Sequence, residues 1–119
     1  PMELESLARR VKEKFGLPFV VVYGQNRVPD PVSRVAVCPG AGGSEIGRAL
    51  ESGAQVLVTG DIGHHQGIDS VAQRMAVIDA GHYGLEHIFV DYMAGFLAEQ
   101  LGSGAELLKA LPEWPAVVL

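Results

Sequence analysis

The sequence predicts an α/β fold: a three-layer α/β/α sandwich in which helices cover both faces of a mostly parallel or mixed sheet. Short β-branched runs alternate along the chain with segments that have helical spacing, and this order builds a sheet between helical layers. Most of the 15 glycines lie between Gly40 and Gly84 and follow short apolar runs. Turns at the carboxyl ends of strands occupy such positions in α/β proteins, and ligands bind at that edge.

The composition predicts one globular domain and excludes several classes of protein. The 119 residues are 48% hydrophobic and carry a net charge of −5 without a basic run, so we expect no nucleic-acid partner. The single cysteine excludes a disulfide framework and a thiolate zinc site, which fits a reducing cytoplasm. No apolar stretch is long enough to span a membrane, and the N-terminus lacks a signal layout. We therefore expect a cytoplasmic protein with no membrane partner.

The single α/β domain, residues 1–119, has three predicted parts: residues 1–33 (helix, strand and connecting loop), 34–101 (the main lobe) and 102–119 (a C-terminal tail). In the first half, the pattern predicts a helix over 4–15, a strand over 19–23, a loop over 27–33, a buried strand over 34–38 and a helix over 45–51. In the second half, it predicts a strand over 55–58, a helix over 67–74, a strand over 75–78 and a long helix over 85–101. A short helix over 105–111 follows, and residues 112–119 form an edge strand or dock against a partner chain.

The first candidate site is the glycine-rich turn over residues 38–44, where backbone amides at a helix N-terminus suit an anion such as phosphate. Its candidate substrate-binding residues are Gly40, Gly42, Gly43 and Ser44. The turn matches neither of the known phosphate-loop fingerprints, since Glu45 replaces a required glycine and Arg48 a required lysine. A tight structural turn is the alternative. Cys38, at the end of a strand, is expected to be a small apolar core residue.

Two further groups of residues follow the next strands. His64 and His65 come shortly after Asp61 and can bracket a metal or an anionic substrate, or they are solvated loop histidines with Asp61 as a helix cap. His82 and Glu86 are four residues apart on a helix, so their side chains lie on one face. An imidazole and a carboxylate together suit zinc, manganese or iron, although a surface hydrogen bond explains the pair equally well. His87 lies to one side and has no predicted role.

Three motifs together resemble the Nif-three-like family of dinuclear-metal hexameric proteins, whose bacterial members are often named GTP cyclohydrolase 1 type 2 homologues. The resemblance covers residues 34–101 and rests on the order and spacing of Val35-Ala36-Val37-Cys38-x-Gly40-x-Gly42, Thr59-Gly60-Asp61 with His64-His65, and Ile78-Asp79-Ala80-Gly81-His82-x3-Glu86. It implies a two-lobed α/β/α protein that assembles into a toroidal hexamer, with two divalent metals held between the lobes.

The resemblance also implies roles for individual residues. His82 and Glu86 match the family's metal ligands in its C-terminal lobe. His65 matches a histidine near the metals that acts beside them or as a proton donor, and Asp61 is expected to orient it. The family's N-terminal lobe, which completes the metal site, has no counterpart here, so we expect either the C-terminal part of a longer protein or a single-lobe relative. In the second case His64 and His65 of a neighbouring copy supply the missing ligands.

The sequence is compatible with three functions. The first is a metal-dependent hydrolase, or one lobe of it, that acts on GTP as a cyclohydrolase or on a phosphoester, with the turn at Gly40–Ser44 holding a phosphate. The second is a non-catalytic metal-binding module for oligomerisation, in which the long helix and the tail around Trp114 bury apolar surface against other subunits. The third, a flavodoxin-like nucleotide-binding domain, has the least support because both phosphate fingerprints fail.

Overall fold

The computed structural model describes residues 1–28, 31–114 and 116–119, and it confirms the mixed α/β fold. One four-stranded sheet has the order β1-β4-β3-β2. Its strands are β1 (Val21–Tyr23), β2 (Val35–Ala41), β3 (Val56–Gly60) and β4 (Ala76–Asp79). The three strands β2, β3 and β4 run parallel, while β1 is antiparallel to β4. The carboxyl ends of β2, β3 and β4 therefore meet at one edge of the sheet.

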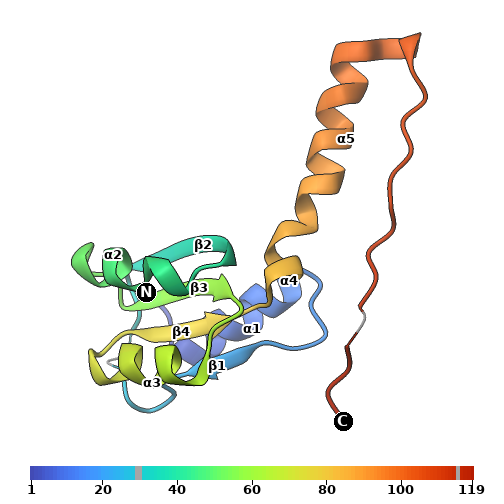
Figure 1. Cartoon of the computed structure of the whole chain (residues 1–119). Helices are drawn as coiled ribbons and strands as arrows, with labels where there is room; N and C mark the ends of the chain where they lie inside the picture. Colours follow the sequence, from blue (N-terminus) through green and yellow to red (C-terminus); the bar gives the residue numbers. More distant parts are fainter. Residues whose placement is uncertain (29–30, 115) are drawn as a thin grey trace.

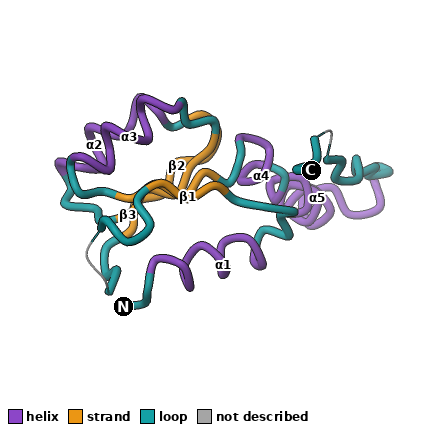
Figure 2. The backbone as a smooth tube through the Cα atoms, turned by 90° about the horizontal axis from the view of Figure 1, so that it is seen from below, coloured by secondary structure: helices purple, strands orange, loops and turns teal. Residues whose placement is uncertain are grey.

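Helices cover both faces of the sheet, as the sequence predicts. Helix α1 (Leu4–Lys14) lies on one face, and α2 (Ile46–Glu51) and α3 (His64–Ala72) lie on the other (Figure 2). Successive residues of a strand point to opposite faces, so β3 contributes to two cores. Val56 and Val58 belong to the cluster that contains residues of α1, whereas Leu57 belongs to the cluster that contains Ala49 of α2. Every residue of β3 is buried because the strand is central.

Strand β2 differs from the buried strand that the sequence predicts. It is longer, extends through the glycine turn to Ala41, and forms one edge of the sheet. Ala36 and Cys38 pack against the cluster under α2 but are only half-buried, so Cys38 lies at the margin of the core that the sequence predicts for it. Val35 and Val37 on the other face are exposed. Helix α1 packs against buried residues of β3 and β4 but against none of β2. This face of β2 therefore stays open. Strand β1 is shorter than its predicted run and begins at Val21.

The predicted long helix is divided at His87 into α4 (His82–Glu86) and α5 (Ile88–Leu101). Helix α4 packs on the sheet through Leu85, but α5 extends away from the rest of the molecule (Figure 1) and contains no buried residue. The apolar stripe of α5 therefore does not face a core of this chain. Helix α3 also differs from its prediction, since it starts three residues earlier, at His64, and ends at Ala72.

The C-terminal part corrects two predictions. After the short 3₁₀ helix η2 (Gly102–Gly104), residues 106–111 form no helix. A helix of that length nucleates at a cost that only packing can offset, and this segment is exposed throughout. The described residues of 112–119 form no strand, and residue 115 lies outside the described part. Residues 29 and 30 of the predicted 27–33 loop also lie outside it. No helix in the described ranges is long and apolar enough to cross a membrane.

The central position of β3 makes Leu57 a test of the core under α2. Leu57 is 1% exposed, so Leu57→Ala should lower the free energy of unfolding by about 2–5 kcal/mol through lost burial and a cavity. Val37, on the open face of β2, is 63% exposed, and Val37→Ala should change that free energy by no more than about 0.5 kcal/mol. Urea unfolding of both variants measures the difference. Equal effects would contradict the assignment of β2 as an open edge.

The C-terminal segment is linked to α5 by an exposed ion pair. Lys109 Nζ lies 2.8 Å from Asp91 Oδ1, and this hydrogen bond and the lysine's charge lower the pKa of the Asp91 carboxyl. The pair therefore stabilises the fold above the carboxyl's unfolded pKa of about 3.9, and this contribution is lost as pH falls through the lowered folded value. Lys109→Met should raise the pKa of Asp91 toward its ordinary value in an NMR titration. An unchanged pKa would show that the segment does not lie against α5.

Candidate metal centre

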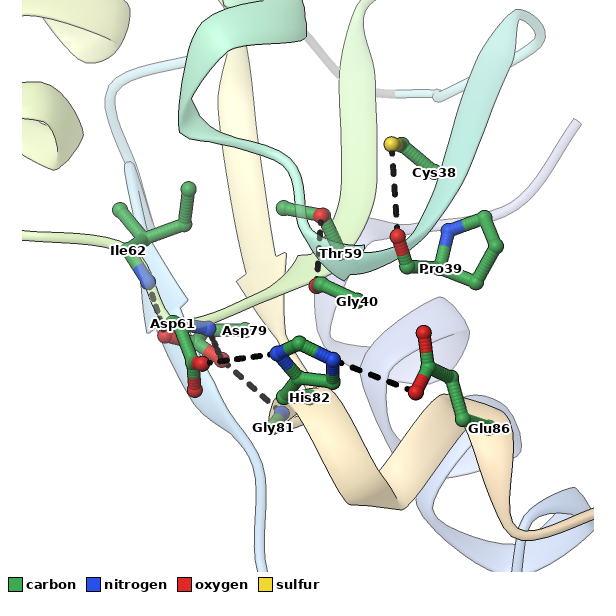
Figure 3. A network of polar contacts seen from close by, with 10 residues as sticks. All are labelled: Cys38, Pro39, Gly40, Thr59, Asp61, Ile62, Asp79, Gly81, His82 and Glu86. Carbon is green, nitrogen blue, oxygen red and sulfur yellow. Dashed lines mark hydrogen bonds and ion pairs between the residues drawn. The ribbon is translucent and has the colours of Figure 1, made fainter.

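The Asp79 carboxylate, at the end of β4, joins the turns that follow two neighbouring strands. It accepts backbone N–H hydrogen bonds from Asp61 at 3.1 Å and Ile62 at 2.8 Å, both after β3, and from Gly81 at 2.9 Å, before α4 (Figure 3). One carboxylate thus satisfies three backbone donors that no strand or helix uses. It holds the β3 and β4 turns against each other.

The backbone of these turns is shaped for close contact. A Cβ on Gly60 would lie 2.4 Å from the carbonyl carbon of Gly81, so only glycine lets the two turns touch. Asp61 and Gly81 both have left-handed backbone conformations, with φ of 56° and 76°. Asp61 is among the few non-glycine residues that tolerate this region, and its turn brings the carboxylate to α4.

His82, the first residue of α4, lies between two carboxylates (Figure 3). Its Nδ1 is 3.1 Å from Asp61 Oδ2, and its Nε2 is 3.2 Å from Glu86 Oε2, one helical turn further on. The His82 and Glu86 side chains are 50% and 49% exposed, so both remain accessible. The sequence predicts that Asp61 orients His65, but the structure pairs Asp61 with His82.

The chemistry of this pair fits a bound cation. When Nδ1–H donates to Asp61, Nε2 of the neutral His82 ring is an acceptor that faces the acceptor oxygens of Glu86. A positive charge between Nε2 and the Glu86 oxygens, either a proton or a metal ion, removes the electrostatic repulsion between these acceptor atoms. Two atoms bound to one zinc ion at about 2.1 Å lie roughly 3.0–3.4 Å apart at tetrahedral to octahedral angles, and the observed 3.2 Å falls in that range. Metal-binding histidines also usually donate their other ring N–H to a carboxylate.

Gly40 keeps the space beside the pair open. Its φ is 72°, and a Cβ there would lie 2.9 Å from Glu86 Oε1 and 3.4 Å from His82 Nε2. A side chain at this position would therefore press on the Glu86 carboxylate and touch the His82 ring. Three neighbouring strand ends therefore contribute to this place: Gly40 near the end of β2, Asp61 after β3 and His82 after β4.

The donor set within this chain is incomplete. Among the described residues, no group of three or more His, Cys, Asp or Glu side chains is arranged to hold a metal ion. His82 and Glu86 offer two donors, while Asp61 is engaged on the other ring nitrogen. Catalytic zinc sites usually have three protein ligands and structural sites four.

The glycine turn has a packing explanation. A Cβ on Gly42 would meet Thr59 Oγ1 at 2.1 Å, and one on Gly43 would meet Gln66 Nε2 at 2.3 Å. The turn leads into a three-residue 3₁₀ helix, η1 (Gly43–Glu45), and then into the short α2. This geometry favours the structural alternative for Gly42 and Gly43, and anion binding by this turn, including Ser44, stays a prediction.

His64 and His65 lie at the exposed start of α3, with ring centroids 5.6 Å apart. The N-terminus of α3 is capped by Gln66, whose Oε1 accepts from the backbone N–H of Gly63 at 2.9 Å. The alternative in which Asp61 caps this helix is therefore wrong. The roles of His64 in substrate binding and of His65 in proton transfer stay predictions.

Two contributing residues have no role in the sequence prediction. Asp79 lies inside the third motif, and an aspartate between a strand and a glycine turn is a signal for backbone capping. His87 gives no such signal: its Nε2 lies 2.7 Å from the carbonyl oxygen of Phe15, which is 72 positions away in sequence. This contact ties the junction of α4 and α5 to the end of α1.

Comparison with known proteins decides the family. The family model described as Duf34/NIF3 (NGG1p interacting factor 3) matches residues 1–110. The chain belongs to the Duf34/NIF3 family. This result confirms the Nif-three-like resemblance of the sequence motifs.

Relatives in the Duf34/NIF3 family are much longer than this chain. A Streptococcus pneumoniae protein named GTP cyclohydrolase 1 type 2 homolog is 39% identical over 101 residues, which are 83% of this chain and 38% of that protein. The Schizosaccharomyces pombe protein named Protein NIF3 homolog is 32% identical over 103 residues, 87% of this chain and 35% of that protein. The crystal structure of a Bacillus cereus protein related to NIF3 superimposes with a TM-score of 0.88 at 27% identity, and covers 98% of this chain and 32% of that one. The chain thus spans about a third of these relatives.

The role of Asp79 can be tested by its removal. Asp79→Ala leaves three backbone donors without a partner and should lower the free energy of unfolding by about 2–4 kcal/mol, because hydrogen bonds to charged groups are worth about 1.5–3 kcal/mol each and do not add fully. Asp79→Asn keeps one acceptor oxygen and should lose less. Urea unfolding measures both variants, with Asp69→Ala on the exposed surface of α3 as control. An Asp79→Ala effect no larger than the control's would show that the carboxylate does not hold the turns.

Proposed function

We propose that this chain is the divalent-metal-binding lobe of a cytoplasmic, metal-dependent hydrolase. The observation that carries the proposal is the placement of His82 Nε2 3.2 Å from Glu86 Oε2, with Nδ1 held by Asp61. The space that Gly40 leaves beside these two donors supports it. Zinc, manganese and iron are the ions that suit an imidazole with a carboxylate, and two ions per complete site follow from the family resemblance.

The remaining ligands come from outside this chain. Its described residues provide two donors where a catalytic site usually needs three, and the chain spans about a third of its relatives. A second lobe or a neighbouring copy in a homo-oligomer, a hexamer by family resemblance, therefore completes the site. His64 and His65 of such a copy are accessible donors at the start of α3.

The residues of this chain have distinct tasks in the proposed reaction. A divalent ion held by His82 and Glu86 would supply Lewis-acid chemistry, which polarises bound water and stabilises the negative charge that develops on oxygen and nitrogen atoms when water adds to a ring carbon, or on oxygen when it adds to a phosphoryl group. Asp61 fixes the orientation of the His82 ring, and His65 is the candidate proton donor. Beside Glu86 lies a groove of about 720 Å³ with apolar walls that include Pro39, Phe89 and Tyr92. This groove suits a substrate with an apolar or aromatic part next to the hydrolysed group.

Two substrate classes are candidates, and the name of a relative points to one of them. The name GTP cyclohydrolase 1 type 2 homolog, carried by the Streptococcus pneumoniae relative, points to ring opening of GTP. A phosphoester is the other candidate, since the same ion chemistry stabilises both transition states. Assays of metal-loaded protein with GTP and with an aryl phosphoester distinguish the two.

A non-catalytic metal-binding oligomerisation module is the second candidate, and α5 is the observation that favours it. This helix has no buried residue and exposes a row of aromatic side chains, including Tyr92 at 72%. An exposed apolar surface of this kind usually marks an interface. The module would bind metal and assemble, but it would show no turnover when all ligands are present.

Metal content tests the proposed site. Purified protein dialysed against an excess of zinc or manganese should retain metal weakly, because the chain offers two of the usual three donors, and both His82→Ala and Glu86→Gln should reduce the retained amount about tenfold or more, since each removes one of the two. Mass spectrometry of the metal measures this. Glu13→Gln, on the exposed side of α1, is the matched control and should keep the wild-type content. Equal metal in all four proteins would contradict a site at His82 and Glu86.

A further inference from the structure

The described part of the C-terminal segment, residues 105–114 and 116–119, returns from the far end of α5 toward the sheet (Figure 1). Two polar contacts fix its path. Lys109 pairs with Asp91 of α5, and the backbone N–H of Glu113 donates to the hydroxyl of Tyr83 at 3.3 Å. The second contact brings the segment to α4, the helix that carries His82 and Glu86.

An aromatic cluster follows directly after that contact. The Trp114 ring lies edge-on to Tyr83, with centroids 5.4 Å apart, and edge-on to His87 at 5.5 Å. Tyr83 and His87 are themselves 5.8 Å apart. These separations are those of favourable aromatic pairs. Trp114 is 37% exposed, whereas Leu111 in the same segment is 82% exposed, so the contact is specific to the tryptophan.

The residues that Trp114 contacts are the sequence neighbours of the two candidate metal ligands. Tyr83 follows His82, and His87 follows Glu86. Trp114 therefore bridges the two ends of α4 on one side of the helix. The groove of about 410 Å³ that Trp114 helps to line also includes Asp61 and His82, so the segment adjoins the candidate site.

Helix α4 depends on such outside support. It is five residues long, and its N-cap residue, Gly81, provides no side-chain cap. A helix of this length is unstable without tertiary packing. Leu85 anchors its inner side, at 3% exposure, and the bond from His87 to Phe15 anchors its end. On the side that carries Tyr83, the Trp114 ring contacts the helix, while both rings stay partly exposed.

We infer that Trp114 is a positioning residue: it holds α4 so that His82 and Glu86 keep the spacing that a metal ion requires. The metal-binding part of this inference rests on the proposed function, but the ordering of α4 does not. Coupling between two binding events is reciprocal, so a clamp that strengthens metal binding is itself strengthened by the metal. The environment of the Trp114 ring therefore changes when a metal binds at His82 and Glu86.

The first experiment needs no metal. Hydrogen exchange of the α4 amides, residues 82–87, is compared in the full chain and in three variants. Trp114→Ala should speed exchange about three- to tenfold, because it removes two aromatic contacts, while Trp114→Phe should restore most of the protection. Leu111→Ala is the control in the same segment and should leave exchange unchanged. Equal exchange in wild type and Trp114→Ala would overturn the inference.

The second experiment measures the coupling to metal. Zinc titrated into the chain should bind about three- to tenfold more weakly to Trp114→Ala than to wild type and Leu111→Ala. Trp114 is the only tryptophan in the sequence, so its fluorescence reports the clamp directly and should change on zinc binding in wild type but not in Glu86→Gln. Equal zinc affinity of wild type and Trp114→Ala would overturn the coupling. Absence of zinc binding in the wild type would overturn the metal-binding part of the inference, and the exchange experiment would still decide whether Trp114 orders α4.

Discussion

The Asp79 carboxylate is the constraint on which the candidate site depends. Parallel strands bring their carboxyl ends together, but this alone does not align the turns that follow them. The three N–H bonds to Asp79 fix the turn after β3 against the turn before α4, and Gly60 allows the backbones to touch. His82 starts α4 directly after Gly81, so the position of its ring follows from this junction.

This junction also sets the orientation of the His82 ring. Asp61 reaches Nδ1 of His82 because its turn is left-handed, and Nε2 is thereby directed at Glu86. When Nδ1–H donates to Asp61, two acceptors face each other beside Gly40, where no side chain intervenes. In the proposed function, a bound cation lies between these two acceptors. In the proposed function, the missing donors come from the part of the family's length that this chain does not span, or from a neighbouring copy.

The sequence predicts what local patterns encode. Strands β3 and β4 and the pairing of His82 with Glu86 follow from apolar runs and from helical spacing, and both appear in the structure. The roles of Asp79 and His87 depend on contacts between distant segments, which no local pattern reveals. Periodicity also predicts one helix over 85–101, but it does not show whether the apolar stripe meets a core of the same chain. Helix α5 forms with its apolar stripe exposed, because no core of this chain lies against it. Residues 106–111 have helix-forming composition, but no packing supports a helix there.

In the proposed site, His82 and Glu86 bind one metal ion together, while the Asp61 carboxylate accepts a hydrogen bond from Nδ1 of the His82 ring. Anomalous scattering from crystals grown with zinc tests it most directly. We predict a peak within bonding distance of both His82 Nε2 and a Glu86 carboxylate oxygen, with the Asp61 to Nδ1 contact retained. A zinc peak at other residues, or His82 binding through Nδ1 with Asp61 displaced, would contradict it.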